Sequence, residues 1–408
     1  MNILLLNHYA GSVEMGMEFR PYYFAREWVK MGYSVRIAAG DFSHLRMKNP
    51  QVIRDFQEEV IDGIHYHWIR TGDYKRNGAR RAATMFRFVG KLWLKARWIA
   101  RNWKPDVIIA SSTYPLDTYA AQRIGRFSGA RVIHEVHDMW PSTLYEIGGM
   151  SRQHPFVALM QAAENSAYRH SAYVVSLLPF AKKYMLRHGM KAGQFVHIPN
   201  GVELDEWKNQ DPLPENLKTF FRKTKETYPF IVGYFGGHAI SNALDALLDA
   251  AKEMQGSGIA FVLAGNGCEK ERLISRKQNE IIDNLYFLEP VSRREIPALV
   301  SNFDCIYMGA HDSPLYRFGI CMNKLYDSLM AGKPIVCAVT VRHTIIEQYK
   351  AGIRVNSGDI AGIVSAITEL AGMDSQERKQ MGLRGKKAVQ EHFEYHRLAK
   401  QFAVLFEE

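Results

Sequence analysis

The chain has 408 residues, 47% of them hydrophobic and 12% aromatic, which is enough to bury more than one core. A single core rarely exceeds about 250–300 residues, so two domains are expected. No stretch approaches the ~20 apolar residues of a membrane span, and the opening MNILLLNHYAG lacks the basic region of a signal peptide, which predicts a cytosolic protein. The four cysteines have no paired CxxC spacing, which favours reduced core residues over a disulfide or zinc framework.

The net charge of +10 is unevenly distributed along the chain. Residues 1–204 contain 27 Lys and Arg against 16 Asp and Glu, whereas residues 205–408 contain 25 against 26. A charge that served only solubility would not prefer one half. The asymmetry therefore indicates an acidic partner for the first half, such as an anionic membrane surface, a phosphorylated acceptor or nucleic acid.

Buried strands and amphipathic helices alternate through the first half. We predict a strand at residues 2–7, a helix from Met17 to Lys30, and a strand at residues 34–39. Further strands are predicted at residues 106–110, 131–135, 173–175 and 195–198. This alternation is typical of a parallel sheet with helices on both faces.

A second alternating series follows a break in the pattern. Residues 197–203 (HIPNGVE) and the polar stretch 207–214 indicate a linker. Strands are then predicted at residues 230–235, 259–264, 285–288, 305–308, 335–338 and 353–355. We therefore predict an α/β protein with two Rossmann-like, doubly wound domains that face a cleft, at residues 1–203 and 204–394. In such sheets ligands bind beyond the carboxyl ends of the strands.

Residues 80–103 predict one long helix with two different faces. One face is an apolar seam, formed by Met85, Val89, Leu92, Ala96, Ile99 and Trp103. The opposite face is basic and interleaved with two apolar residues, and it consists of Arg80, Arg87, Lys91, Leu94, Lys95, Arg97, Trp98 and Arg101. Such a face suits the headgroup region of an anionic bilayer, and the alternative is a solvated helix face.

Two loops of the first half follow predicted strands and carry polar groups. In residues 8–16, backbone amides up to Gly16 could meet phosphate or acceptor oxygens at the start of a helix. In residues 134–140 (HEVHDMW), His137 and Asp138 could orient sugar hydroxyls or assist proton transfer, with Glu135 on the other face of the strand.

Loops of the second half predict a diphosphate site. Gly236 and Gly237 allow close approach of a diphosphate, to which His238 or Asn242 could donate. The turn at Gly265 could border a nucleotide. The backbone at Val291 is a plausible edge for a base.

The stretch 316–334 (YRFGICMNKLYDSLMAGKP) predicts a phosphate-binding turn that leads into a helix. The turn comprises Arg317, Gly319 and the backbone up to Ile320. Asn323 is expected to cap the helix with its side chain, and Lys324 to favour phosphate charge. Asp327 can accept hydrogen bonds from a diol, and Gly332 fits the position after the helix. The chain has no Walker A, HExxH, GxSxG or DxD motif, so we expect neither a metal nor another cofactor.

These motifs resemble glycosyltransferase family 4, the retaining enzymes of GT-B architecture. The resemblance rests on IPNGVE (198–203), VGYFGG (232–237), FVLAGNG (261–267) and RFGICMNKLYDSLMAGKPIV (317–336). It is strongest for bacterial O-antigen and capsule amino-sugar transferases. It implies that Asp327 contacts the donor ribose, that Gly319 replaces a glutamate expected near the donor sugar, and that His137 lies beside that sugar. It also implies that the last helix, residues 395–408, returns to the first domain.

The resemblance implies a retaining transfer of a sugar, such as an N-acetylated amino sugar, from a UDP-sugar to a lipid-diphosphate-linked glycan. Lys324 and the loop at Gly236 would stabilise the leaving diphosphate, and the protein would lie on the inner face of the cell membrane. Two alternatives remain, a non-hydrolysing UDP-sugar 2-epimerase and an inactive nucleotide-sugar-binding protein. Nucleic-acid binding is disfavoured, because no nucleic-acid module surrounds the basic helix.

Overall fold

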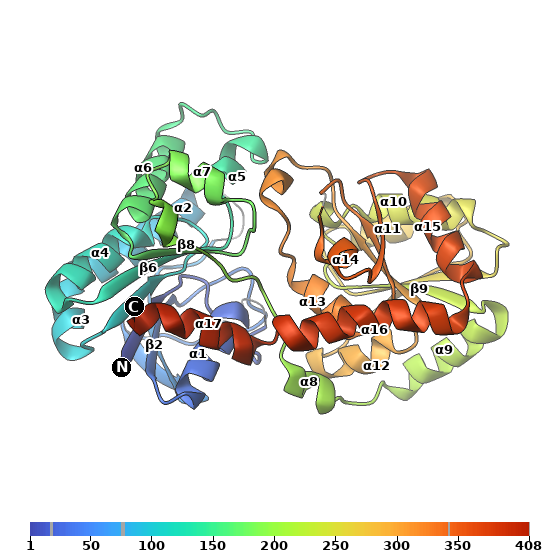
Figure 1. The fold of residues 1–408 in the computed structure, drawn as a ribbon, viewed down its shortest axis with the longest axis horizontal. Coiled ribbons are helices and arrows are strands. Elements are labelled where there is room, and N and C mark those ends of the chain that lie inside the picture. The colour runs from blue at the N-terminus through green and yellow to red at the C-terminus, as the bar shows by residue number, and fades with distance from the viewer. Residues whose placement is uncertain (17–18, 75–77, 342, 408) are drawn as a thin grey trace. The chain divides into compact units, whose positions relative to one another are not determined.

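The computed structural model describes residues 1–16, 19–74, 78–341 and 343–407 and divides the chain into two compact units (Figure 1). Unit 1 comprises residues 1–200, 317–321 and 395–408, and unit 2 comprises residues 201–316 and 322–394. Each unit contains one parallel or mostly parallel sheet flanked by helices. The prediction of two α/β domains, each with its own sheet, is therefore confirmed.

The sheet of unit 1 has the strand order β3-β4-β2-β1-β5-β6-β7-β8, with β3 antiparallel to β4 and the other neighbours parallel. The strands are β1 (Asn2–Leu6), β2 (Ser34–Gly40), β3 (Gln57–Ile61), β4 (Ile64–Ile69), β5 (Val107–Ala110), β6 (Arg131–Val136), β7 (Tyr173–Ser176) and β8 (Phe195–His197). The helices are α1 (Phe19–Lys30), α2 (Ala79–Leu94), α3 (Ala96–Asn102), α4 (Asp117–Ser128), α5 (Ser142–Glu146), α6 (Pro155–His170), α7 (Lys182–Arg187) and α17 (Tyr395–Glu407). The predicted start of the first helix at Met17 lies outside the described residues.

Successive side chains of a strand point to opposite faces, and this alternation divides the helices of unit 1 into two layers. Ile3 and Leu5 of β1 belong to the core that α1 and α17 cover. Leu4 and Leu6 belong to the core beneath α2, α3 and α4. Helix α17 is tied to α1 by the indole of Trp28, which donates to the carbonyl of Ala399 (3.1 Å).

The hairpin of β3 and β4 is absent from the strands predicted above. Its turn is Asp62–Gly63, and both residues have positive φ, 51° and 77°. An Asp-Gly pair between two extended segments is a strong hairpin signal, so the sequence did contain the information. The strand β3 is an edge strand with three exposed residues at its centre, which explains the absence of a continuous apolar run.

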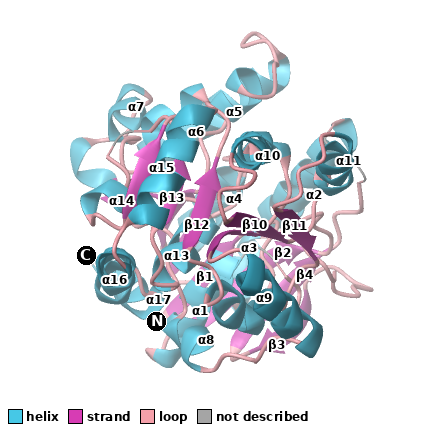
Figure 2. Cartoon of the chain, turned by 90° about the vertical axis from the view of Figure 1, so that its right-hand side faces the viewer, coloured by secondary structure: helices cyan, strands magenta, loops and turns pink. Residues whose placement is uncertain are grey.

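Unit 2 contains a six-stranded parallel sheet of order β11-β10-β9-β12-β13-β14. Figure 2 labels β10, β11, β12 and β13 of this sheet. Its strands are β9 (Phe230–Phe235), β10 (Ile259–Ala264), β11 (Leu285–Leu288), β12 (Cys305–Gly309), β13 (Ile335–Ala338) and β14 (Gly352–Val355). Its helices are α8 (Leu204–Lys208), α9 (Glu215–Thr227), α10 (Leu244–Glu253), α11 (Lys270–Asn279), α12 (Ile296–Val300), α13 (Asn323–Met330), α14 (Ile345–Gln348), α15 (Ile360–Gly372) and α16 (Ser375–His392). All six strands of the second predicted series are therefore found, within one residue at each end.

Three local predictions were wrong. The helix predicted at residues 80–103 is two helices, because Lys95 leaves helical geometry between α2 and α3, which keeps Ala96 and Ile99 against the core. The linker predicted at 207–214 begins within helix α8. Asn323 is the first residue of α13 rather than its cap, and no side chain caps that helix.

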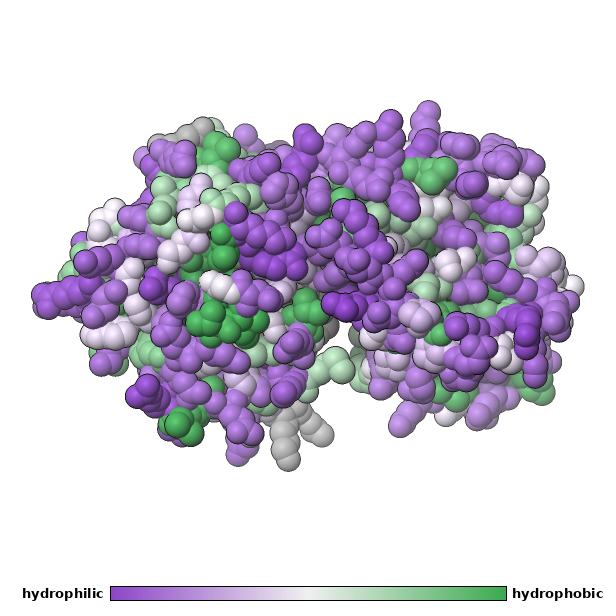
Figure 3. Space-filling model, turned by 90° about the horizontal axis from the view of Figure 1, so that it is seen from below, coloured by the Kyte–Doolittle hydropathy of each residue, from purple (hydrophilic) through white to green (hydrophobic). Residues whose placement is uncertain are grey.

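Most exposed apolar residues of the protein lie apart from one another, as on ordinary protein surfaces. On the face in Figure 3, hydrophilic residues predominate and apolar residues form small separate patches. Helices α2 and α6 depart from this pattern, since Phe86, Trp93, Leu94 and Leu159 are all exposed there.

Candidate functional site

The loops after β9 and β10 of unit 2 form a tightly packed glycine-rich surface. The amide of Gly236 donates to the carbonyl of Ala264 (3.0 Å), and the amide of His238 donates to the carbonyl of Asn266 (2.8 Å). A Cβ on Gly265 would lie 1.9 Å from the carbonyl oxygen of Gly236. Position 265 therefore requires glycine, because a side chain there would keep the ends of β9 and β10 apart. Its φ of +150° also favours glycine.

His238 is buried below this loop, and neither of its ring nitrogens has a partner among the residues that the structure describes. Burial and the charges of Lys270 and Lys324 lower the pKa of His238 to about 4, so its ring is neutral near pH 7. A buried polar ring without a hydrogen bond is unfavourable unless a ligand completes it. His238 was predicted to donate to a diphosphate, and a neutral ring can still do so through its single N–H group.

Lys324 lies in the first turn of α13 and reaches the glycine-rich loop. Its ammonium donates to the Tyr234 hydroxyl (3.3 Å) and to the side-chain oxygen of Asn242, and it lies 4.8 Å from the centre of the Tyr234 ring. The Asn242 amide in turn donates to the carbonyl of Gly237 (2.7 Å).

No carboxylate pairs with Lys324 in the described parts of the chain. Burial lowers the pKa of Lys324 to about 7. A buried ammonium without a counter-ion is costly, and an anion bound beside it would relieve that cost. The structure therefore brings together Gly236, Gly237, Asn242 and Lys324, as the sequence predicted, around a place that favours negative charge.

Asp327, one turn along α13, is held by an arginine that the sequence reasoning missed. Arg293 donates to both oxygens of Asp327 (2.8 and 3.1 Å) and, through Nε, to Glu206 (2.8 Å). The carboxylate of Asp327 is nearly buried. A ligand diol can reach this carboxylate only if Arg293 yields part of its bidentate contact. Helix α13 then ends as predicted, with Gly332 at φ +66° after Ala331.

The turn before α13 belongs to unit 1 rather than to the Lys324 cluster. Arg317 pairs with both oxygens of Glu146 (2.6 and 2.7 Å), so its charge is already compensated. The backbone is fixed by the amide of Phe180, which donates to the carbonyl of Phe318 (3.0 Å). Ile320 lies in the same segment, two residues before the helix cap at Met322.

Gly319 has a φ of +96°, and a Cβ there would lie 2.7 Å from Cδ of Pro179. Both observations exclude a larger residue in this conformation. The local backbone thus explains why the expected glutamate is replaced by glycine.

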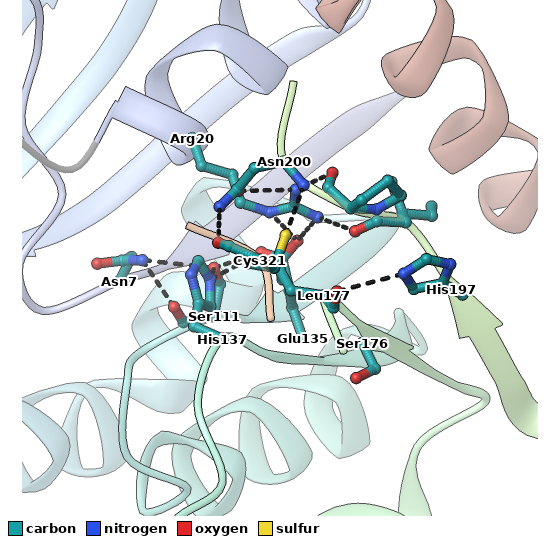
Figure 4. Close-up of polar contacts among 12 residues, drawn as sticks. Asn7, Arg20, Ser111, Glu135, His137, Ser176, Leu177, His197, Asn200 and Cys321 are labelled. Atoms are coloured by element: carbon teal, nitrogen blue, oxygen red, sulfur yellow. Dashed lines mark hydrogen bonds and ion pairs between the residues drawn. The ribbon is translucent and has the colours of Figure 1, made fainter. Parts of the chain in front are cut away.

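A buried polar network occupies the carboxyl ends of β5 and β6 in unit 1 (Figure 4). The Ser111 hydroxyl donates to Oε2 of Glu135 (2.6 Å), and Nε2 of His137 lies 2.9 Å from the Ser111 oxygen and 3.2 Å from the same Glu135 oxygen. Because the Ser111 hydroxyl donates to Glu135, its oxygen accepts from His137, which assigns a proton to Nε2 of that ring.

Glu135 therefore lies on the same side of β6 as His137, and its predicted placement on the other face was wrong. Two residues apart on a strand share a face, which is the physical reason.

Arg20 holds Glu135 as an anion. Its Nε and Nη2 donate to Oε1 of Glu135 (3.0 and 2.9 Å), and it also donates to the carbonyls of Ile198 and Pro199 and to the side chain of Asn200. Burial alone would raise the pKa of Glu135, but Arg20, His137 and the Ser111 hydroxyl lower it well below its usual range. Arg20 thereby links the His137 network to the segment 198–200.

The remaining predicted residues have plainer surroundings. Asp138 accepts from the amide of Met139 (2.8 Å) and the hydroxyl of Thr143 (3.1 Å) at the start of α5, and burial raises its pKa. Gly16 has a φ of +67° and packs against Met47. Val291 lies in the loop after β11, before a short 3-10 helix.

The basic residues of α2 and α3 fall into two groups. Arg87 donates to the carbonyl of Thr71 (2.8 Å), and Lys91 pairs with Asp55 (2.7 Å), so both are tied to neighbouring loops. Lys95 and Arg101 are exposed, as the sequence predicted. Leu94 and Trp98 are also exposed, by 75% and 43%, which bears out their predicted place outside the core.

Comparison with known families identifies the architecture. Residues 15–201 match the family of glycosyl transferase 4-like domains, and residues 215–388 match the glycosyl transferases group 1. The chain belongs to the GT-B glycosyltransferases. Its glycosyltransferase relatives include WcaI of Escherichia coli K12, whose name assigns it to colanic acid biosynthesis. WcaI is 24% identical over 218 residues, which span 50% of this chain and 51% of WcaI.

Solved structures resemble the whole glycosyltransferase chain. Sucrose-phosphate synthase from Thermosynechococcus elongatus has a TM-score of 0.72 at 16% identity, over 99% of this chain and 98% of that one. HepE from Anabaena, in complex with UDP-glucose, has a TM-score of 0.67 at 14% identity, over 99% and 98% of the two chains. At such identities these likenesses show the fold alone.

Sequence reasoning did not select four residues that contact the predicted site residues within the two units. Arg293 and Glu146 each neutralise a predicted ligand-binding side chain, and Arg20 and Ser111 organise the His137 network. These contacts join residues that are 24 to 171 positions apart in the sequence, so no local spacing identifies them. Among the described helices, none combines the length and apolarity that crossing a membrane requires.

Proposed function

We propose that this glycosyltransferase moves a sugar from a nucleotide diphosphate, specifically a UDP-sugar, to a lipid-linked glycan in the synthesis of a cell-surface polysaccharide. The observation that carries the donor half of the proposal is Lys324. Its ammonium lies beside the Gly236–Gly237 loop, its pKa is lowered to about 7, and the described residues offer it no carboxylate. A donor diphosphate supplies the missing negative charge.

In the proposed complex, groups of unit 2 hold the diphosphate and the ribose of the donor. We propose that the amide of Gly237, the neutral ring of His238 and the uncapped start of α13 donate to phosphate oxygens. Asp327 would accept hydrogen bonds from the ribose once Arg293 shifts towards Glu206, to which it already donates. We propose that this binding uses no metal, because Lys324 and the backbone donors can meet the charge of the diphosphate.

We propose a transfer that retains the anomeric configuration. The bond from the anomeric carbon to the donor diphosphate breaks, and a bond to the acceptor oxygen forms on the same face of the sugar. The proton of the acceptor hydroxyl passes to the leaving diphosphate. In unit 1, His137 is the proposed residue that orients the acceptor hydroxyl, because Glu135 and Ser111 hold its ring in place through Nε2.

The distribution of charge supports the proposals of a lipid-linked acceptor and of attachment to the inner face of the membrane. Unit 1 carries the excess positive charge of the chain, and exposed basic residues accompany the exposed Leu94 and Trp98. The name of WcaI, which assigns that relative to colanic acid biosynthesis, agrees with such an acceptor. As part of the same proposal, the transferred sugar is one such as an N-acetylated amino sugar.

The test is release of nucleotide from a panel of UDP-, GDP- and ADP-sugars, with and without lipid-diphosphate-linked acceptor sugars. Acceptor-dependent release of UDP is the expected result. Epimerised nucleotide sugar formed without acceptor would instead identify an epimerase. Donor binding without turnover under any acceptor would identify an inactive binding protein.

A further inference from the structure

Helix α2 has a second apolar face that the core of unit 1 does not cover. Phe88 and Leu92 are buried in the core, whereas Phe86, Trp93 and Leu94 expose 46%, 40% and 75% of their surface. Monomeric proteins rarely expose clustered aromatic and aliphatic side chains without a use for them.

Two hollows follow this face of α2. The first, of about 770 Å³, lies between the start of α2, α5 and the start of α6, and its lining includes Ala82, Met85, Leu144 and Phe156. The second, of about 370 Å³, is lined by the rest of α2 together with Leu116, Tyr119 and Leu159.

The two hollows lie in series along α2 and α6. Phe86 lines the second hollow and Phe156 the first, and their rings meet edge to face with centres 6.3 Å apart. We call the two hollows together the α2 trough. Each hollow by itself has a volume typical of small-molecule sites, which are also mainly apolar.

The helical segment that forms the α2 side of the trough carries charges of one sign. Residues 79–104 contain eight Lys or Arg and no Asp or Glu. Arg81 lines the first hollow, and the guanidinium of Arg123 lies 3.5 Å from the centre of the Trp93 ring. A ligand that matches both the apolar lining and the positive charge has a long apolar chain and an anionic headgroup.

We propose that the α2 trough binds the hydrocarbon chain of a prenyl diphosphate, as the lipid part of the acceptor. This proposal rests on the proposed function for the identity of that lipid. The chain lies against Phe86, Trp93 and Leu159, and Arg81 meets the diphosphate. A recessed trough suits a single chain better than the flat surface of a bilayer, which would contact protruding side chains.

Farnesyl diphosphate is a suitable probe, because it is soluble and carries both chain and headgroup. Its binding to the full-length protein would be measured by calorimetry in the presence of saturating UDP, against inorganic diphosphate as the headgroup alone. Leu159→Gln is the test variant and Leu383→Gln the control, since both leucines expose 37% of their surface and Leu383 lies on α16 of unit 2. Neither belongs to the donor or His137 sites.

We expect Leu159→Gln to weaken farnesyl diphosphate binding about tenfold, and Leu383→Gln to leave it unchanged. Inorganic diphosphate should bind much more weakly to all three proteins. Equal affinity of the two variants for farnesyl diphosphate would overturn the proposal.

A second experiment distinguishes a site for a single hydrocarbon chain from a surface that contacts a bilayer. If Leu159→Gln impaired binding to phosphatidylglycerol vesicles without prenyl lipid as much as it impaired farnesyl diphosphate binding, the trough would be a bilayer contact and the proposal wrong. Neither measurement depends on turnover. Failure of the proposed function, seen as no nucleotide release from any donor and acceptor, is therefore distinguishable from failure of the trough.

Discussion

Donor binding should depend on the protonation of Lys324. The lysine has an ordinary pKa of 10.5, and burial lowers this to about 7 in the ligand-free protein. A bound diphosphate stabilises the ammonium, so binding favours the charged form. Affinity for a UDP-sugar is therefore full below about pH 7 and declines as the pH rises through the pKa of the free protein.

The size of the effect follows from the charged fraction of Lys324. With a pKa of about 7, that fraction falls from about 90% at about pH 6 to about 1% at about pH 9. If the bound pKa stays above the assay range, the dissociation constant rises about 90-fold over that interval.

Calorimetric titration with a UDP-sugar at several pH values would measure this dependence. A UDP-sugar is preferable to UDP, because the terminal phosphate of UDP itself titrates near pH 6. Lys324→Arg should bind at high pH with little loss, since its guanidinium stays charged, and Lys324→Gln should bind weakly at every pH. A wild-type profile that is flat, or that persists in Lys324→Gln, would refute the assignment of Lys324 to the diphosphate.

Three further substitutions have defined outcomes. Gly319→Glu should lower the free energy of unfolding by about 1–3 kcal/mol in urea titrations without raising turnover, because its φ is +96° and Pro179 occupies the space of a Cβ. Arg20→Ala should cost about 3–5 kcal/mol in the same assay, since it leaves the buried carboxylate of Glu135 without its counter-ion, and a loss under 1 kcal/mol would contradict this. Arg293→Ala should raise the preference for UDP over its 2′,3′-dideoxy analogue by up to about tenfold, as it frees a carboxylate for the ribose, and an unchanged ratio would exclude that carboxylate from ribose binding.

Most strands could be predicted from the sequence because buried parallel strands are short continuous apolar runs, as in Phe230–Phe235 and Ile259–Ala264. The same rule missed β3, an edge strand whose exposed side chains interrupt the apolar pattern. The break between helices α2 and α3 at Lys95 could not be predicted either, since the apolar seam continues through it without a change of spacing.

Candidate residues were selected by their position after strands and by their chemistry, and that reasoning proposed the loop at Gly236, Lys324 and His137 as site residues. It could not assign their partners. Arg317 and Asp327 have the composition of ligand-binding residues, yet Glu146 and Arg293 pair with them in the folded chain. These partners lie 171 and 34 residues away, so only packing brings them together.

The sequence by itself determined the two-sheet architecture, the basic character of the first half and the glycine-rich and lysine-bearing segments of the second, because these depend on local periodicity and composition. The tertiary structure decided which charges are compensated. It paired Arg317, Asp327 and Glu135, and left Lys324 without a carboxylate among the described residues. Ion pairing depends on which side chains meet across strands and helices, and burial then sets the pKa of any charge that remains unpaired.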